Sequence, residues 1–146
     1  MKSRIAQIVF VGVSVSSLTL MAQAVSAGAS SWSAYSSQCT KWLNDIPKLD
    51  SYIIQDNKVG NVTALSLAML ALSADGRHIE ACNNSPDSAL NAVAAAWGKS
   101  LIVAGGYGFA WANHQSASNL SMFLSKEGVA KSFENQYLNR LAALGR

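Results

Sequence analysis

Apolar side chains recur at steps of three and four along most of the chain from Trp32 onward, and this spacing limits the possible fold more than any other feature of the sequence. A period of this kind places apolar side chains on one face of an α-helix. No segment shows the sustained alternation of apolar and polar residues between hairpin turns that is typical of strands. The sequence therefore predicts an all-α fold, a single small bundle of four to six helices.

The first predicted helix contains a proline. Its apolar face comprises Trp32, Tyr35, Cys39, Trp42, Ile46, Leu49 and Ile53. Pro47 lacks an amide donor, and its ring clashes with the preceding helical turn. We therefore expect either a kink or two helices that meet near Asp45, followed by a connection at residues 58–60.

The second predicted helix covers residues 62–74. Asn61 is a suitable N-cap, because its side chain can accept a hydrogen bond from an amide of the first turn. Asp75 and Gly76 are typical turn residues and predict the end of this helix. A short turn through Ile79 follows.

Ser85, Pro86 and Asp87 form the clearest helix start in the sequence. Serine is a favoured N-cap, proline is tolerated at the first helical position, and aspartate complements the helix dipole. A last helix is expected to end at Gly145, with an apolar face of Val129, Phe133, Tyr137, Leu141 and Leu144. The predicted common core comprises Leu67, Leu70, Leu90, Val93, Trp97, Leu101 and Phe133.

The first 27 residues have the pattern of an export signal. Lys2 and Arg4 precede an apolar stretch over residues 5–21. Two small-x-small cleavage patterns follow, one ending at Ala24 and one at Ala27. We expect a signal peptide at residues 1–27 and one helical domain at residues 28–146 in a periplasmic or secreted protein; the alternative is an uncleaved N-terminal anchor.

Two cysteines, Cys39 and Cys82, lie 43 positions apart in the predicted domain. In an oxidising compartment an even number of cysteines favours pairing, and two cysteines allow one connectivity. The alternative is a pair of buried free thiols or a redox pair, although the Cys-x-x-Cys motif is absent. We expect a structural disulfide.

The charge of the predicted domain is close to zero. The first 27 residues hold two of the eleven Lys and Arg residues and none of the eight Asp and Glu residues, so nine basic and eight acidic residues remain. No basic cluster remains that could follow a phosphate backbone, which disfavours nucleic-acid binding.

Common catalytic and metal-binding motifs are missing. There is no Gly-x-Ser-x-Gly elbow and no complete phosphate-binding loop, and the two histidines have no second ligand at metal-binding spacing. We therefore expect no enzymatic activity, no cofactor and no metal. The alternative is a small exported hydrolase whose site includes Asp75, His78 and Glu80, although a charged turn between helices would group these residues in the same way.

Two apolar runs, residues 62–74 and 101–112, are too short to span a membrane and are expected to be core helices. Within the second run, residues 105–108 are rich in glycine, which favours close helix packing over a hinge or ligand loop. Tyr107 and Trp111 lie one helical turn apart and are the candidate partner-binding residues. The alternative is that all four tryptophans brace the core.

Two cysteine-containing segments flank a central apolar helix: they are Cys39-Thr40-Lys41-Trp42-Leu43 and Ile79-Glu80-Ala81-Cys82, and a further helix follows Ser85-Pro86. This layout resembles that of small periplasmic helical proteins of the HdeA type. Those are acid-stress chaperones in which one disulfide joins two helices around a central hydrophobic one. The resemblance covers residues 32–97 and implies a chaperone-like role; residues 101–146 have no counterpart in it.

Two classes of function remain. The first is an exported, non-catalytic module that binds another periplasmic or exported protein, either as a chaperone or as an immunity or inhibitor protein. The second is the small hydrolase with a site near Asp75, His78 and Glu80. The missing catalytic motifs and the tryptophans favour the first class.

Overall fold

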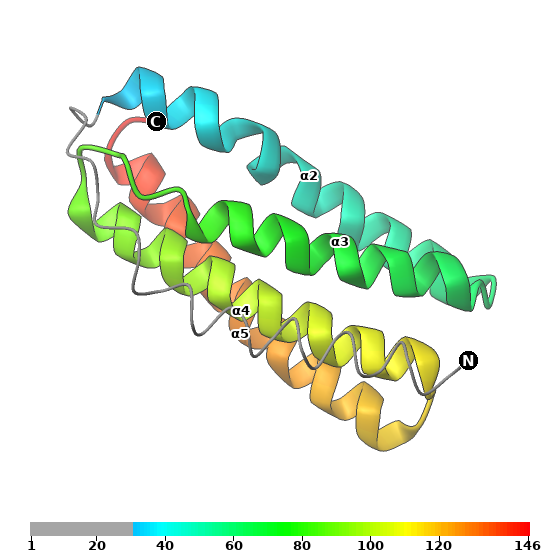
Figure 1. The fold of residues 1–146 in the computed structure, drawn as a ribbon. Coiled ribbons are helices and arrows are strands. Elements are labelled where there is room, and N and C mark those ends of the chain that lie inside the picture. Colours follow the sequence, from blue (N-terminus) through cyan, green and yellow to red (C-terminus); the bar gives the residue numbers. More distant parts are fainter. Residues whose placement is uncertain (1–30) are drawn as a thin grey trace, which may run out of the picture.

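A computed structural model of the protein describes residues 31–146, and the predicted signal peptide lies outside these residues. The described chain forms four helices and no strand: α2 (Trp32–Lys58), α3 (Val62–Glu80), α4 (Ser88–Asn113) and α5 (Ala117–Ala143). They run alternately up and down the long axis of the bundle (Figure 1). The predicted all-α bundle of four to six helices is confirmed.

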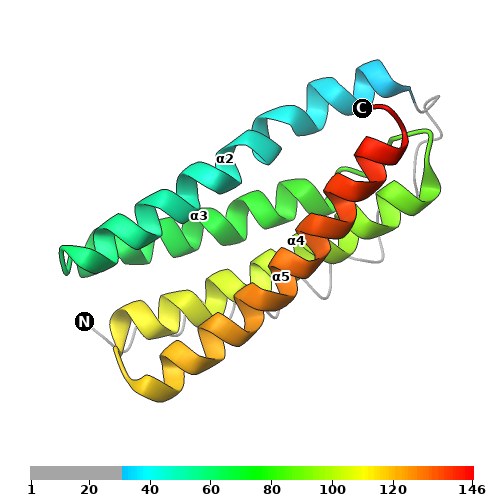
Figure 2. The same ribbon diagram turned by 180° about the vertical axis from the view of Figure 1, so that it is seen from behind.

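Helix α4 packs against both α3 and α5, and α2 packs against α3 on the far side. Figures 1 and 2 show these neighbours from opposite sides of the bundle. The C-terminus lies beside the start of α2, where the guanidinium of Arg146 is 5.0 Å from the centre of the Trp32 ring. The four helices thus form one chain of neighbours, with α3 and α4 in the middle and α2 and α5 on the outside.

Helix α2 continues through Pro47 as one element. The proline is exposed, while the neighbouring Ile46 is buried and holds the middle of the helix against the core. Ser51 Oγ donates a hydrogen bond to the carbonyl oxygen of Pro47, at 3.1 Å. The prediction of two helices meeting near Asp45 is therefore wrong.

Helix α3 begins as predicted but ends later. Asn61 Oδ1 accepts a hydrogen bond from the Ala64 amide at 3.1 Å, which confirms the N-cap. The predicted end at Asp75 and Gly76 is wrong, because the helix continues to Glu80. Gly76 is buried against α4, where an added Cβ would lie only 2.8 Å from the carbonyl oxygen of Gly98. This glycine permits close helix packing and does not form a turn.

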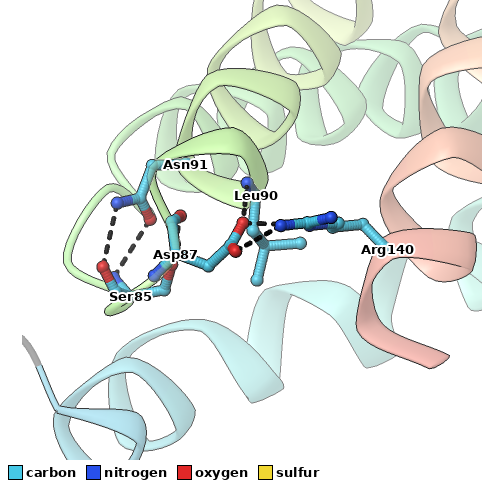
Figure 3. Close-up of polar contacts among 5 residues, drawn as sticks. All are labelled: Ser85, Asp87, Leu90, Asn91 and Arg140. Carbon is cyan, nitrogen blue, oxygen red and sulfur yellow. Dashed lines mark hydrogen bonds and ion pairs between the residues drawn. The ribbon is translucent and has the colours of Figure 1, made fainter. Parts of the chain in front are cut away.

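The N-cap of helix α4 lies two residues after the predicted one. Asp87 is the N-cap, and its Oδ1 accepts from the Leu90 amide at 2.7 Å (Figure 3). Ser85, the predicted cap, is buried in the preceding loop, where its backbone exchanges two hydrogen bonds of 3.0 Å with the Asn91 side chain. The Arg140 guanidinium donates to both carboxylate oxygens of Asp87, at 3.1 and 2.5 Å. Asp87 therefore caps α4 and also joins it to α5.

Glycines allow α3 and α4 to approach closely. A Cβ on Gly98 would collide with the backbone of Gly76 and Glu80, and one on Gly105 would collide with Ser73 and Met69. A Cβ on Gly108 would collide with Met69, so the packing role predicted for residues 105–108 is confirmed for Gly105 and Gly108 but not for Gly106, which faces open space. Three small side chains at four-residue spacing on α4 are also buried: they are Ala104, Gly108 and Ala112.

We expect Gly98→Ala to destabilise the fold by about 1–3 kcal/mol, because α3 and α4 must separate to admit the methyl group. Gly106→Ala is the matched control, since an added Cβ there meets nothing within 4 Å. In this half-buried helical position, where the methyl group has open space, alanine should be neutral or stabilising by up to about 1 kcal/mol. Urea unfolding of both variants tests the difference, and equal effects would contradict it.

The disulfide between Cys39 and Cys82 is present, with a Cα–Cα distance of 5.9 Å, and both cysteines are buried. The prediction is confirmed, and the free-thiol alternative is wrong. Around the disulfide lies the larger core cluster, whose buried members include Tyr35, Ile79 and Trp97.

The predicted core is correct except on α3. Leu90, Trp97 and Leu101 are buried, and Val93 and Phe133 are half-buried against them. Leu67 and Leu70 are exposed to 61% and 42%, so their assignment to the core is wrong. The inward face of α3 is already occupied by Leu65, Ala68, Met69 and Leu72.

Candidate functional site

Two of the three residues of the hydrolase alternative face α2. His78 stacks on Trp42, with ring centres 3.7 Å apart and planes within 7° of parallel. The ammonium of Lys41 lies 4.4 Å from the centre of the same Trp42 ring. Asp75, one helical turn before His78, is 8% exposed. Nothing in the sequence pairs Trp42 with His78, because the contact depends on how two separate helices pack.

Burial raises the pKa of Asp75, and the nearby Asp45 carboxylate raises it further, while His78 and Lys41 act in the opposite direction. Glu80 lies on another side of α3, because five residues rotate a helix by about 140°. Its carboxylate approaches Lys99 of α4, at 3.9 Å. Asp75 and Glu80 therefore do not converge on a common point. Within residues 31–146, no group of His, Cys, Asp and Glu side chains is arranged to hold a metal ion.

The two candidate partner-binding residues differ in exposure. Tyr107 is 39% exposed, and the Lys126 ammonium lies 5.7 Å from its ring centre. Trp111 is only 7% exposed and stacks on Phe123, with ring centres 5.6 Å apart. Trp97 is buried as well, while Trp32 and Trp42 are half-buried. The two rings of the predicted pair therefore do not form one exposed surface, although Tyr107 is accessible.

Tyr107 is one of several exposed apolar side chains on the adjacent helices α3 and α4. Five large apolar side chains of these helices are exposed by between 39% and 61%; beyond Val62, the first residue of α3, they are Leu67, Leu70, Val103 and Tyr107. We call these last four the outer apolar face. The sequence contained a signal for it, because residues 62–74 are apolar on more sides than one buried helix face requires.

Two hydrogen bonds between α3 and α4 fix the register of the outer apolar face. Ser73 Oγ donates to the carbonyl oxygen of Ile102 at 3.3 Å, and Asn113 Nδ2 donates to Ser66 Oγ at 3.3 Å. Leu70 lies one helical turn from both serines and therefore at the edge of α3 that borders α4. The Leu70 side chain is 42% exposed there.

The outer apolar face carries no charge. Residues 62–74 and 100–113 contain no Asp, Glu, Lys or Arg. Apart from the Lys126 ammonium of α5 near Tyr107, a partner can therefore bury these apolar side chains without desolvating an ion of either segment. Large exposed apolar patches are typical of interaction sites. Across residues 31–146, no helix combines the length and the hydropathy needed to cross a membrane.

Comparison of the chain with protein families, with curated proteins and with solved structures finds no match. The resemblance to the HdeA type therefore stays a prediction.

Proposed function

We propose that this protein is an exported, non-catalytic module that binds another protein through its outer apolar face. The observation that carries the proposal is the exposure of Leu67, Leu70, Val103 and Tyr107 on two adjacent helices without a charge among them. Burying such side chains is a main source of affinity in protein complexes. The partner chemistry that fits is an apolar helix or loop, as a chaperone or an immunity or inhibitor protein would bind.

Export is supported by two features. Residues 1–27 have the signal pattern, and the described domain contains a disulfide, which persists mainly in oxidising compartments. The intact mass of the protein recovered from the periplasm should correspond to a chain that begins near Gly28 and has no free thiol.

Site-specific photo-crosslinking in the native compartment tests the binding surface. A photoreactive amino acid at Leu67 or Val103 should give a covalent adduct with a partner, which mass spectrometry identifies. Leu124 and Leu138 on α5 are matched control positions, since they are exposed to 52% and 51%. Adducts from the control positions alone, or from none of the four, would contradict the proposal.

The identified partner is then purified and titrated with the protein. Leu67→Glu with Val103→Glu should weaken binding at least about tenfold, because each introduced carboxylate would be buried without a counter-ion. Leu124→Glu with Leu138→Glu should leave the affinity unchanged. Because all four side chains are exposed, both double variants should remain folded, which circular dichroism checks.

A further inference from the structure

Helix α2 is an outer helix of the bundle and, like α5, packs closely against one neighbouring helix. Among the described residues, its Cα atoms approach within 8 Å of α3 but not of α4 or α5. It nevertheless closes the core, since Tyr35, Cys39 and Ile46 are buried. One end of α2 is fastened by the Cys39–Cys82 disulfide, and the other end leads into the turn at Gly60, where φ is +68°. Helix α2 therefore lies over the bundle as a strap fixed at both ends (Figure 2).

The space between α2 and α5 is spanned by long side chains, and we call it the α2/α5 seam. Lys131 of α5 reaches Asp50 of α2 at 2.6 Å and Glu134 at 2.9 Å. A cleft of about 10 Å³, room for roughly one water molecule, lies in the seam. Its charged lining residues are Asp50, Glu127, Lys131 and Glu134, so three carboxylates share one ammonium.

Glu127 is the least compensated carboxylate of the seam. Burial raises its pKa, and the Asp50 carboxylate of α2 raises it further, while Lys131 opposes both effects. Helix α4 contributes only Leu101 and Ala104 to the cleft, and α3 contributes Leu72. No titratable group of those two helices therefore lines the cleft.

A second carboxylate borders α2 on its other side. Asp75 of α3 has the charged neighbours Asp45 and Lys41 of α2 and His78 of α3. The Glu80–Lys99 ion pair joins α3 to α4, away from α2. Each side of the strap thus places a carboxyl group of the bundle, the buried Asp75 or the half-buried Glu127, near an aspartate of α2.

We propose that α2 is a pH-sensitive strap. In mildly acidic conditions Glu127 and Asp75 are protonated and no longer repel Asp50 and Asp45 of α2, so α2 is held more firmly against the bundle. As the pH rises to neutral, the repulsion returns and α2 loosens.

The direction of this pH dependence follows from proton binding. A carboxyl group whose pKa is raised by docking of α2 binds protons more strongly when α2 is docked than when it is lifted. The resulting stabilisation is complete at low pH and is lost as the pH rises through the raised pKa. The Asp87–Arg140 pair has the opposite pH dependence: Arg140 lowers the pKa of Asp87, so the stabilisation that this pair provides is lost as the pH falls. It joins α4 to α5 and does not hold α2.

Reduction of the buried disulfide reports how often α2 lifts. Both cysteines are at most 1% exposed, so a phosphine reductant reaches the bond only when the strap opens. The rate at which the phosphine reduces the native protein is measured at about pH 5 and about pH 7.5. Each value is divided by the rate at which the phosphine reduces oxidised glutathione at the same pH, which removes the intrinsic pH dependence of the reagent. We expect the normalised rate to be several-fold lower at the acidic pH.

Variants assign the effect to the two carboxyl groups. Glu127→Gln and Asp75→Asn imitate the protonated side chains. Each should therefore lower the normalised reduction rate at neutral pH, and so lower the ratio of the rate at neutral pH to the rate at acidic pH. In the double variant this ratio should fall close to one. Glu80→Gln is the control and should keep the wild-type ratio. If Asp75→Asn fails to fold, Asp45→Asn is used in its place. It removes the α2 charge next to Asp75 and should also lower the ratio of the two reduction rates.

Three results would overturn the proposal. These are a normalised rate that is equal at both pH values or higher at the acidic pH, an unchanged ratio in the Glu127 and Asp75 variants, and complete resistance of the bond to reduction. Global unfolding is measured in urea at the same two pH values. A reduction rate no faster than global unfolding would also show that α2 does not lift by itself.

Discussion

Trp97→Ala is expected to lower the free energy of unfolding by about 3–5 kcal/mol, as large-to-small changes in a packed core do. Trp97 is 2% exposed, and its ring centre lies 5.3 Å from that of Tyr137. Among the described residues its Nε1 has no hydrogen-bond partner, so the loss comes from packing alone. Urea unfolding monitored by circular dichroism measures the change.

Trp97→Phe is the control for this experiment. It keeps an aromatic ring beside Tyr137 and removes an indole donor that forms no hydrogen bond within residues 31–146. We therefore expect it to lose clearly less stability than the alanine variant. A loss below about 1 kcal/mol for Trp97→Ala would contradict the central position of this side chain.

Replacing both cysteines by serine is expected to cost about 4 kcal/mol, since the bond closes a loop of 43 residues in the unfolded chain. Such a loss is a large share of the net stability of a small domain. The reduced wild-type protein should unfold at nearly the same urea concentration as the double variant. A difference between the two would indicate that the serines themselves disturb the core, and equal stability of variant and oxidised protein would contradict the prediction.

The fold was largely predictable from local patterns. Apolar spacing predicted the helices, Asn61 predicted one cap, and the cysteine count predicted the disulfide. The end of α3 was not predictable, because the role of Gly76 depends on Gly98, which lies 22 positions further along the chain. Asp and Gly side by side are typical of a turn, and only the neighbouring helix shows that this glycine permits contact instead.

The candidate surface was less accessible to sequence reasoning. An apolar pattern shows that a helix has a buried face but not how much apolar surface remains uncovered by its neighbours. Leu67 and Leu70 were assigned to the core for this reason. Tyr107 and Trp111 are one turn apart on α4, yet packing of Phe123 from α5 covers Trp111 and leaves Tyr107 accessible.

The position of the disulfide has a consequence for the order of folding. The bond joins α2 to the segment after α3, so α4 and α5 lie outside the loop that it closes. Trp97 and Tyr137, from those two later helices, belong to the core cluster that buries both sulfur atoms. An oxidant must therefore reach Cys39 and Cys82 before α4 and α5 complete the core, or wait for the domain to reopen. We expect the bond to form early, on an incompletely folded chain, with the second half of the domain closing over it afterwards.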